Sequence, residues 1–524
     1  METLVSTQTM EQIDSRSQSD YSIPALVLME QAGSKGWHAF ADFAKEKGRE
    51  FKNVVFVAGG GNNGGDALVM AREAFFSGLE NFSILLVGSR VSNACSVHRN
   101  ISRKLGFTMF EAENEDGMIS THTSSLLADA DVIVDGIAGT GLRGLLSGTT
   151  AEIVKMINAR QNQGALVMAV DIPSGCSDGM SVAGPRIIAD VTVTMGLRKA
   201  AAYHPVCRMG WGTILRVNPS FPPALLKNSV AVATLSDHAD LKIMPYHEDV
   251  YKNKRGHLAL FAGSTSYTGA PRLTARGAFH SRCGLVTLCC SKDVASVASA
   301  ESPSIIVQSL SDGETVSSHT LSVGYQAIAA GPGWGDGHQD QLIEILNSGL
   351  PTVLDADAIT TFASIVGEHR LQGTAHGPLI LTPHPGELHR MLEALHMPLL
   401  AQETGPSSSP ESFIDSLRRV AVALELVIVY KSHVLWIVDG RNGGALPIVV
   451  DGMNNALGVA GSGDVLTGVI GSLLAQGYDP LQAAHTGVLI HQEAGLRARS
   501  EAGWFDAETL TSHVGIVCRN AEHG

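Results

Sequence analysis

An aspartate follows two closely spaced glycines in the run Gly461-Ser462-Gly463-Asp464, and an apolar stretch of small residues continues from Val465 to Leu474. That stretch predicts a helix, and the glycines leave backbone N–H groups at its start open to an anion. A carboxylate is also stable at the positive end of a helix without any function. This run alone therefore leaves a helix cap and a phosphoryl-transfer base equally open.

Other polar residues follow buried strands in the same half of the chain. Asp355 and Asp357 come after one strand, Thr382-Pro383-His384-Pro385-Gly386-Glu387 after the next, and Lys431 after a third. In a parallel α/β sheet the ligands collect where strands end, so these side chains are expected to meet Asp464. Simpler roles stay open: His384 could cap a turn, the two aspartates could be structural or help to hold magnesium, and Lys431 could be a surface charge.

The first half carries oxygen-rich turns after its own strands. A strand at 54–58 leads into the glycine-rich turn 59–66 and a helix from Ala67 to Phe76, and later strands end at Asp135 and at Asp171-Ile172-Pro173-Ser174-Gly175. The spacing matches neither the Rossmann fingerprint nor a P-loop. Hard oxygen ligands without His or Cys suit an alkali or alkaline-earth ion. The alternative for the adjacent asparagines Asn62 and Asn63 is turn chemistry.

Strands alternate with helices in both halves, which predicts parallel sheets covered on both faces. We therefore expect an α/β protein with two three-layer αβα domains. Three prolines within 219–223 interrupt regular structure, so we place the domains at 1–222 and 223–524, with a connecting segment up to Met244-Pro245. A helix is predicted from Ile23 to Lys47, with Glu30 as a solvated carboxylate on it. Residues 1–20 form either an amphipathic first helix or a loose arm.

Composition narrows the class of protein. The 524 residues include 56 glycines, are 44% hydrophobic and carry a net charge of −14, which excludes fibrous and disordered chains and argues against a nucleic acid polymer as partner. No apolar run approaches the roughly 18 residues of a membrane span, and the first residues lack a basic, apolar leader. The 7 cysteines are scattered without a C-x-x-C pair, so we expect reduced, buried thiols in a cytoplasmic protein.

The oxygen-rich turns of the first half resemble the NAD(P)H-hydrate epimerase family over about residues 20–218, through Glu30-Gln31-Ala32-Gly33, Gly61 to Asp66, Asp135, Gly139-Thr140-Gly141 and Asp171 to Gly175. The resemblance implies a Rossmann-like domain that interconverts the two configurations of hydrated NADH or NADPH. It implies K⁺ held by Asn63, Asp135 and Ser174, and Asp171 as the acid/base carboxylate. The implied dinucleotide contacts are Asn62, Asn63, Gly64, Gly65, Asp66, Gly139, Thr140, Gly141, Leu142, Arg143, Gly144, Leu145 and Asp171. The departures are Gln31, where Asn is usual, and Ala67, where Gly is common.

The second half is similar to the ribokinase-like superfamily and, within it, to the ADP-dependent NAD(P)H-hydrate dehydratase family over about residues 245–518. The resemblance implies Mg²⁺ and ADP as phosphoryl donor, although the sequence does not distinguish ADP from ATP. It implies that Ala270, Gly333, His384 and Asp464 contact the hydrated nucleotide, and that Lys431, Ser432, His433, Val434, Leu435 and Gly463 hold ADP. The chain departs from the family pattern at Ser432-His433, at Tyr251-Lys252-Asn253 and at Asn454-Asn455, which puts the donor pocket in question.

Together the resemblances imply a bifunctional repair enzyme that epimerises the R and S hydrates and dehydrates the S form, giving AMP and phosphate from ADP. Phosphorylation suits this reaction because hydroxide is a poor leaving group, whereas phosphate can be expelled by the lone pair of the ring nitrogen. In this mechanism Asp464 takes the hydroxyl proton and the amides of 461–463 face the phosphoryl group. The alternatives are a ribokinase-like small-molecule kinase with a fused nucleotide-binding domain, and an inactive nucleotide sensor. Both families tend to self-associate, so we expect a homo-oligomer.

Overall fold

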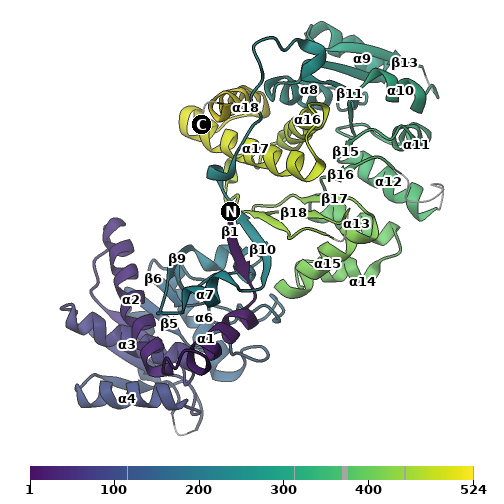
Figure 1. The fold of residues 1–524 in the computed structure, drawn as a ribbon. Helices are drawn as coiled ribbons and strands as arrows, with labels where there is room; N and C mark the ends of the chain where they lie inside the picture. Colours follow the sequence, from purple (N-terminus) through teal and green to yellow (C-terminus); the bar gives the residue numbers. More distant parts are fainter. Residues whose placement is uncertain (115, 302, 312, 369–375, 442–443, 523–524) are drawn as a thin grey trace. The chain divides into compact units, whose positions relative to one another are not determined.

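The computed structural model describes residues 1–114, 116–301, 303–311, 313–368, 376–441 and 444–522. The chain divides into two compact units (Figure 1): an N-terminal unit of residues 3–233 and 406–413, and a C-terminal unit of residues 1–2, 234–405 and 414–524. The N-terminal unit extends past the predicted boundary at 222/223 because helix α7 (Pro223–Lys227) packs against α1 (Thr7–Ser19) and buries Leu225 in the core.

The N-terminal unit is built on a sheet in which every adjacent pair of strands runs parallel. The carboxyl ends of the strands therefore share one edge, as the sequence predicted. From edge to edge the strands are β4 (Met109–Glu111), β3 (Phe82–Leu86), β2 (Val54–Ala58), β5 (Val132–Gly136), β6 (Leu166–Val170), β7 (Val191–Met195) and β9 (Thr213–Val217).

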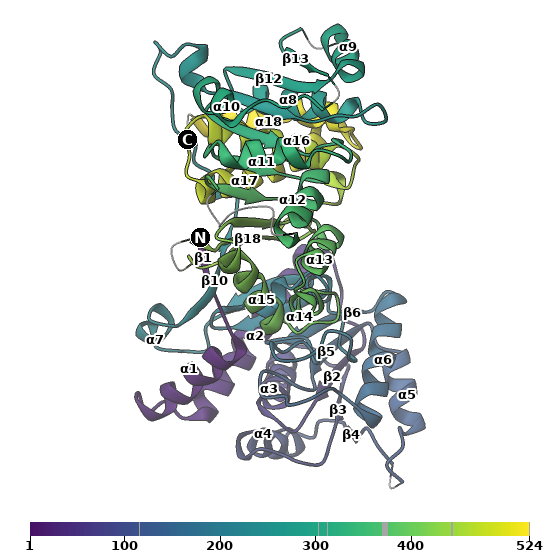
Figure 2. The same ribbon diagram turned by 90° about the vertical axis from the view of Figure 1, so that its right-hand side faces the viewer.

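Helices cover both faces of this sheet (Figure 2). Alternate residues of a strand point to opposite faces, and β2 shows the consequence: Val54, Phe56 and Ala58 belong to one hydrophobic cluster, Val55 and Val57 to another. One face carries α2 (Ala25–Glu46), α3 (Asn62–Phe76) and α4 (Asn93–Lys104), and the other carries α5 (Thr121–Ala128) and α6 (Gly148–Asn162).

The first residues form an ordered part of this unit, which decides between the two alternatives left by the sequence. Strand β1 (Glu2–Val5) pairs parallel with β8 (Arg198–Lys199), through Leu4 with Arg198 and Val5 with Lys199. Helix α1 follows at once, because the Ser6 hydroxyl accepts a hydrogen bond from the Thr9 backbone N–H at 3.0 Å and caps the helix. Its residues Met10 and Ile13 are buried, so the segment is an amphipathic helix and not a loose arm.

The sheet of the C-terminal unit is mostly parallel. Its strands run parallel from β13 to β17, whereas β18 is antiparallel to both of its neighbours. The predicted connecting segment contains a strand, since Thr234 to Ser236 pair with Ile448 to Val450. The order is β13 (Ile306–Leu310), β12 (Leu285–Ser291), β11 (His257–Phe261), β14 (Ala327–Ala330), β15 (Thr352–Leu354), β16 (Leu379–Leu381), β17 (Val427–Tyr430), β18 (Leu435–Asp439), β19 (Ile448–Val450) and β10 (Ala231–Ser236).

Two groups of helices enclose this sheet (Figures 1 and 2). Gly468 lets two of them cross closely, because a Cβ atom there would lie 1.9 Å from the Thr274 carbonyl oxygen. One face carries α8 (Gly269–His280), α16 (Ser462–Ala475), α17 (Pro480–Ala502) and α18 (Ala507–Glu522), and the other carries α11 (Gln339–Asn347), α12 (Asp357–Gly367) and α13 (Pro385–Ala394). The remaining helices are α9 (Lys292–Glu301), α10 (Ser318–Gly324), α14 (Pro398–Glu403) and α15 (Pro410–Ala423).

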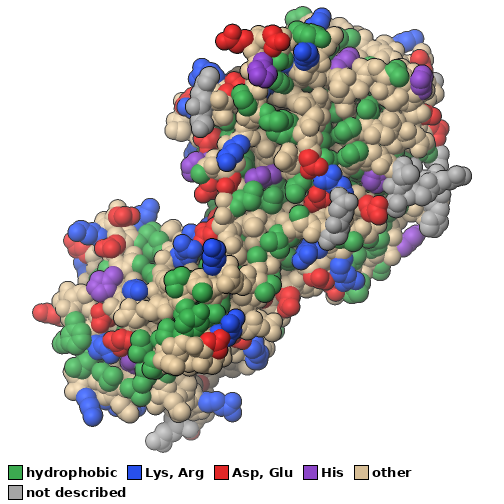
Figure 3. Space-filling model, viewed as in Figure 1, with side chains coloured by type: hydrophobic (Ala, Val, Ile, Leu, Met, Phe, Trp, Pro, Cys, Tyr) green, Lys and Arg blue, Asp and Glu red, His purple; other side chains and the backbone are tan. Residues whose placement is uncertain are grey.

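The surface charge, the cysteines and the helix lengths bear on the expectations drawn from composition. Acidic and basic side chains are interspersed over the face shown in Figure 3. All cysteines are free and buried, which confirms the prediction of reduced thiols. In the described part of the chain, no helix has both the length and the apolar character needed to cross a membrane.

Candidate active sites

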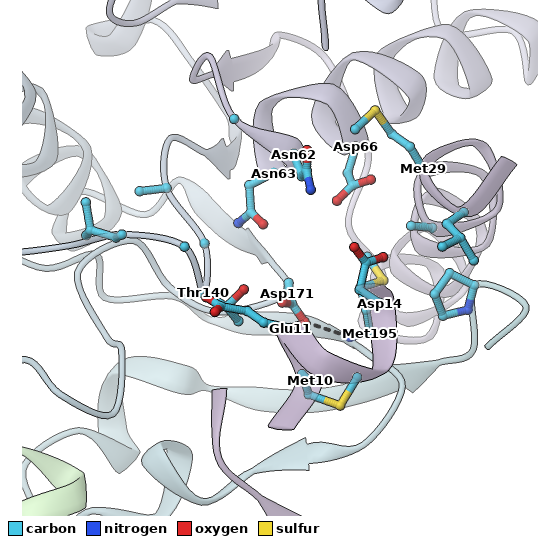
Figure 4. A pocket seen from close by; sticks show the side chains of 18 of the residues that line it. Met10, Glu11, Asp14, Met29, Asn62, Asn63, Asp66, Thr140, Asp171 and Met195 are labelled. Carbon is cyan, nitrogen blue, oxygen red and sulfur yellow. Dashed lines mark hydrogen bonds between the residues drawn. The ribbon is translucent and has the colours of Figure 1, made fainter. Parts of the chain in front are cut away.

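A cavity of about 570 Å³ opens at the carboxyl edge of the N-terminal sheet (Figure 4). Its size lies in the range typical of small-molecule and cofactor sites. Of the residues predicted to contact a dinucleotide, those that line it are Asn62, Asn63, Asp66, Gly139, Thr140, Gly141, Leu142, Arg143 and Asp171, whereas Gly64, Gly65, Gly144 and Leu145 are not part of the lining.

The glycine-rich stretch after β2 forms the first turn of a helix, since α3 begins at Asn62 and not at Ala67 as predicted. Its glycines are explained by packing. A Cβ atom at Gly64 would lie 1.9 Å from the Gly59 carbonyl oxygen, and one at Gly65 would lie 2.3 Å from the Met29 sulfur. The close approach of α3 to β2 and α2 therefore requires glycine, and the side chains of the same turn are left to face the cavity.

The residues proposed for K⁺ lie at neighbouring strand ends. Ser174 donates two hydrogen bonds to the Asp135 carboxylate, from its hydroxyl at 2.6 Å and from its backbone N–H at 2.8 Å. The Asn63 amide nitrogen donates to the Val170 carbonyl at 2.7 Å, which turns its carbonyl oxygen toward Gly139, where a Cβ atom would lie 2.2 Å away. These oxygens thus share one small region of the sheet edge.

Asp135 is fully buried, and burial raises its pKa to about 6 despite the hydrogen bonds from Ser174 and Ile137. Among the described residues no cationic side chain forms an ion pair with it. A buried carboxylate with hydrogen bonds but no counter-charge is stabilised by a cation. The donor set, which consists of oxygens only, therefore fits a monovalent hard cation such as K⁺.

Asp171 is held by a lysine that the sequence did not identify. Lys199 pairs with the Asp171 carboxylate and also donates to the Thr194 hydroxyl and the Met195 carbonyl, each at 2.8 Å. The Met195 backbone N–H donates to the same carboxylate at 2.9 Å. Asp171 has a φ of 64°, a left-handed conformation that is costly for this residue type and that clusters at functional sites.

Helix α1 forms a wall of the cavity through Met10, Glu11 and Asp14. No sequence pattern marked these residues, because their position depends on the strand pairing and the helix cap that precede them. Glu11 forms an ion pair with Arg143 of the opposite loop at 3.2 Å. Glu30, predicted to be a solvated helix carboxylate, lies on α2 with its side chain 42% exposed and also pairs with Arg72 on α3.

In the C-terminal unit, Asp355 connects the ends of three strands with the start of α16. Its carboxylate accepts hydrogen bonds from the Thr382 and Thr467 hydroxyls, each at 2.8 Å, and forms an ion pair with Lys431. The Lys431 ammonium also lies beside Gly463, 3.6 Å from the place of a Cβ atom. The structure thus brings Asp355, Lys431 and the glycine run together, as the sequence predicted, and adds Thr467.

Asp464 lies in the first turn of α16, next to these groups. Burial and then repulsion from Asp355 raise its pKa to about 7, while Lys431 acts in the opposite direction. Its carboxylate makes no hydrogen bond to any described residue. Unlike Asp355, it is therefore free to accept a proton or a hydrogen bond from a ligand.

The turn before Asp464 is fixed from two sides. Gly461 has a φ of 88°, which favours glycine. The Ser462 carbonyl accepts a hydrogen bond from the Nε2 atom of His491 at 2.9 Å, and burial lowers the pKa of that histidine to about 4. A neutral imidazole on α17 thus holds the loop, a role that no spacing in the sequence indicated.

Of the residues predicted to contact the hydrated nucleotide, Ala270 and Gly333 lie together, whereas His384 begins a helix. Ala270 and Gly333 are neighbours, since a Cβ atom at Gly333 would lie 3.1 Å from that of Ala270. His384 caps α13: its Nδ1 atom accepts hydrogen bonds from the backbone N–H groups of Gly386 at 3.0 Å and Glu387 at 3.3 Å. The capping alternative for His384 is therefore realised, and its ring remains half exposed.

The predicted donor stretch is the turn between β17 and β18. The Ser432 hydroxyl donates to the Val434 carbonyl at 2.5 Å and accepts from its N–H at 3.1 Å, so the departure at this position is accommodated as a side-chain-stabilised turn. Val434 and Leu435 are buried, while His433 is exposed.

Acidic residues that could hold Mg²⁺ are few. In the part of the chain that the structure describes, no three His, Cys, Asp or Glu side chains converge as a metal site. Asp357 follows Ala356, whose φ is 45°, and accepts a hydrogen bond from the Gly335 N–H at 2.7 Å with one oxygen. Mg²⁺ needs only one or two carboxylates when phosphate oxygens and waters complete its shell, so Asp357 fits as the single protein ligand.

Comparison with known proteins gives two family models along the chain. Residues 258–514 match the model described as NAD(P)H-hydrate dehydratase, and residues 25–201 match the YjeF-related protein N-terminus. The dehydratase of Bacillus subtilis co-crystallised with ATP and Mg²⁺ is 25% identical, with a TM-score of 0.45, and the match covers 55% of this chain and 99% of that one.

Whole-length relatives are found as well. The bifunctional NAD(P)H-hydrate repair enzyme Nnr of Dictyoglomus turgidum is 29% identical over 520 residues, which cover 93% of this chain and 92% of the relative. The enzyme of the same name from Thermofilum pendens is 31% identical over 517 residues, 94% of this chain and 91% of the relative. A match of this identity over nearly the full length of both chains includes both units, and the chain belongs to the family of bifunctional NAD(P)H-hydrate repair enzymes.

Proposed function

We propose that the chain repairs NADH and NADPH whose nicotinamide ring has taken up water, through an epimerase site in the N-terminal unit and a dehydratase site in the C-terminal unit. Relatives with this bifunctional name match over 93% and 94% of the chain. The observation that carries the proposal is the Asp464 carboxylate, which has no hydrogen-bond partner among the described residues and lies at the open start of α16 beside the Lys431–Asp355 pair.

In the dehydratase site Asp464 takes the proton of the substrate hydroxyl as that oxygen attacks the terminal phosphoryl group of the donor. The N–H groups at the start of α16 and the Lys431 ammonium neutralise the charge on the transferring group. Asp355, with Thr382 and Thr467, holds Lys431 in place. The phosphate ester then leaves as phosphate, because the lone pair of the ring nitrogen forms a C=N⁺ bond to the ring carbon. Loss of a proton from the adjacent ring carbon to solvent then forms the C=C bond and restores the neutral, reduced nicotinamide ring.

Mg²⁺ would be held by Asp357 and supplies charge neutralisation at the donor phosphates when bound. ADP is the proposed donor, with AMP as product. The turn 431–435 offers Lys431, the exposed His433 and backbone groups to it. Since Ser432 replaces a usual glycine there, comparing ADP with ATP in the repair assay tests the donor directly.

In the epimerase site the two configurations of the hydrate are interconverted, which supplies the dehydratase with the S form. Asn63, Asp135 and Ser174 would hold K⁺, which supplies a positive charge near the ring when bound. Asp171 is the proposed acid/base carboxylate, and Lys199 orients it. Exchanging K⁺ for Li⁺ is expected to lower epimerisation without changing dehydration of the S hydrate.

A small-molecule kinase is the first alternative, because the C-terminal fold positions a base and a phosphate site in the same way. Product analysis separates the two functions. Incubation with chemically hydrated NADH, Mg²⁺, K⁺ and ADP or ATP is expected to restore the absorbance of reduced nicotinamide and release phosphate. A persistent phosphate ester without recovered absorbance would favour the kinase.

An inactive nucleotide sensor is the second alternative. The asparagine variant of Asp464 distinguishes it, because a sensor keeps its nucleotide affinity and shows no turnover either before or after the change. Loss of turnover in the variant, with ADP affinity retained, supports the enzyme. Absence of turnover in the unchanged chain would support the sensor.

A further inference from the structure

Two contacts at its N-terminal end fix helix α1 to the epimerase site. Before it, Val5 of β1 pairs with Lys199, the residue whose ammonium holds Asp171. At its first turn, the Thr7 backbone N–H donates to the Asp178 carboxylate, and the Thr7 hydroxyl lies 3.5 Å from that of Ser177. The helix is therefore fixed relative to the loop that carries Ser174, and side chains projecting from it have defined positions in the cavity.

Asp14 projects from this helix into the cavity, where it meets Asp66. Figure 4 shows the two carboxylates turned toward one another, with Asp171 lining the same space. Asp66 is 7% exposed, faces the cavity and makes no hydrogen bond to any described residue. Asp14 has one neutral partner, the side-chain amide of Gln18 at 3.0 Å. A nearly buried polar group that points into a cavity without a partner indicates a ligand group that completes its hydrogen bonding.

The three aspartates of the cavity differ in charge environment. Lys199 pairs with Asp171 alone. Burial is the main cause that raises the pKa of Asp66 and of Asp14, and the negative charge of Asp171 adds to the effect in both; Asp14 adds further to that of Asp66. Burial and like charge both disfavour the ionised form of these neighbouring carboxyl groups, so the arrangement favours a proton held between them. The cavity thus contains an acid and a base made from the same residue type.

We propose that Asp14 is a further catalytic residue of the epimerase site, which shares a proton with Asp66 and presents a neutral carboxylic acid to the hydroxyl of the hydrate, opposite Asp171. The inference rests on the proposed function of this unit. It assigns a role to a helix that precedes the segment matched by the family model, which begins at residue 25.

The proposed step is balanced in protons and electrons. The carboxylic acid gives its proton to the ring hydroxyl, the carbon–oxygen bond breaks, and water leaves with the bonding pair while the nitrogen lone pair forms a C=N⁺ bond. Water then adds to the other face of the ring carbon and returns a proton to the Asp14–Asp66 pair. In this step the proton moves through Asp14 and Asp66 and not through Asp171, which, paired with Lys199, stabilises the cationic intermediate. No oxidant or other reactant is required.

The protonation of the pair depends on every charged group that faces it. These groups come from α1, β8, the loop after β6 and the loop after β5. They are Asp171 with its partner Lys199, and Glu11 with its partner Arg143. Since both cations are engaged by other carboxylates, the balance of charge around Asp14 and Asp66 remains negative.

The test compares the Asp14→Asn and Asp66→Asn variants of the full chain with Asp20→Asn, a matched change at the exposed end of the same helix. In Asp66→Asn the neighbouring negative charge is removed and the pKa of Asp14 falls, so the alkaline limb of the epimerisation rate is expected to move to lower pH, with a loss of roughly tenfold in rate above that limb. The Asp14→Asn variant loses the acid at every pH. A folding defect of the N-terminal unit is recognised as a denaturant midpoint lower than that of Asp20→Asn, and dehydration of pure S hydrate reports the amount of intact C-terminal site.

A second measurement needs no turnover. Carbon-13 NMR of aspartate-labelled, substrate-free protein is expected to show a carboxyl titration that lies above the ordinary range in the unchanged chain and in Asp20→Asn and that moves to lower pH in Asp14→Asn. The same pH profile and the same carboxyl titration in Asp14→Asn, Asp20→Asn and the unchanged chain would overturn the proposal. If the unchanged chain does not epimerise the hydrate at all, the proposed function fails, and the carboxyl titration still decides whether Asp14 and Asp66 share a proton.

Discussion

Both sites place a lysine against an aspartate at the end of a parallel strand, but the lysine holds a different kind of aspartate in each. In the N-terminal unit Lys199 pairs with Asp171, the carboxylate proposed to stabilise the cationic ring. In the C-terminal unit Lys431 pairs with Asp355, and the proposed base Asp464 is left without a hydrogen bond among the described residues. One site therefore fixes its carboxylate, whereas the other fixes the lysine and leaves the carboxylate available.

This difference follows from what each reaction requires. A phosphoryl transfer needs a positioned cation for the phosphate oxygens and a base that is ready to take a proton near neutral pH. An epimerisation that passes through a cationic ring needs a fixed negative charge, with the exchangeable proton on another group. The Lys–Asp pair thus positions a cation for the phosphate oxygens in the C-terminal unit and a negative charge for the ring in the N-terminal unit.

The largest effect is expected from Asp464→Asn. The amide keeps the shape but cannot accept the hydroxyl proton, so the rate of dehydration should fall on the order of 100- to 10,000-fold, while epimerisation is unchanged. The assay is recovery of nicotinamide absorbance from S hydrate. Asp415→Asn, at an exposed position of the same unit, is the control, and a dehydration rate in Asp464→Asn equal to that of the control would contradict the assignment.

Replacing each of the two lysines by methionine tests whether they have different roles in the two sites. Lys199 is fully buried, so Lys199→Met leaves a buried charge unpaired and is expected to lower the free energy of unfolding by about 3 to 5 kcal/mol. Lys431 is 19% exposed, so Lys431→Met should cost less stability and instead raise the KM for ADP. Denaturant midpoints and steady-state kinetics separate the two outcomes, and equal losses of stability would argue against the distinction.

The two activities should respond oppositely to pH. Asp464 acts as a base only when ionised, and its pKa is raised to about 7. The kcat/KM of dehydration is therefore expected to fall tenfold per pH unit below about 7 and to level off above it. Epimerisation depends on a retained proton and should decline as pH rises. Profiles that rise together with pH in both reactions would remove the contrast between the sites.

The smallest effect concerns His384. Because its ring caps α13, His384→Ala is expected to lower the free energy of unfolding by about 1 kcal/mol. His384→Asn keeps a capping oxygen and should restore that stability. If the asparagine variant is stable but has a raised KM for the hydrate, the ring also contacts substrate. If both variants have unchanged KM values, capping is its only role.

The sequence predicted both sheets and the residues that local patterns mark. The glycine run before Asp464 and the carboxylates after strands were identified, because strand ends in a parallel sheet meet at one edge. Lys199, Thr467, His491 and Asp14 were missed, since each reaches its site through contacts between distant elements that no spacing reveals. The start of α3 was placed late because glycines are poor helix formers, yet Gly64 and Gly65 are required there by close packing.

The central claim is that the two sites act in sequence on one substrate, and one time course tests it. A mixture of R and S hydrates of NADH is incubated with the full chain, ADP, Mg²⁺ and K⁺ while nicotinamide absorbance is followed. We predict complete recovery with the unchanged chain, recovery only of the S fraction with Asp171→Asn, and none with Asp464→Asn. Recovery that stops at the S fraction with the unchanged chain as well would contradict the account.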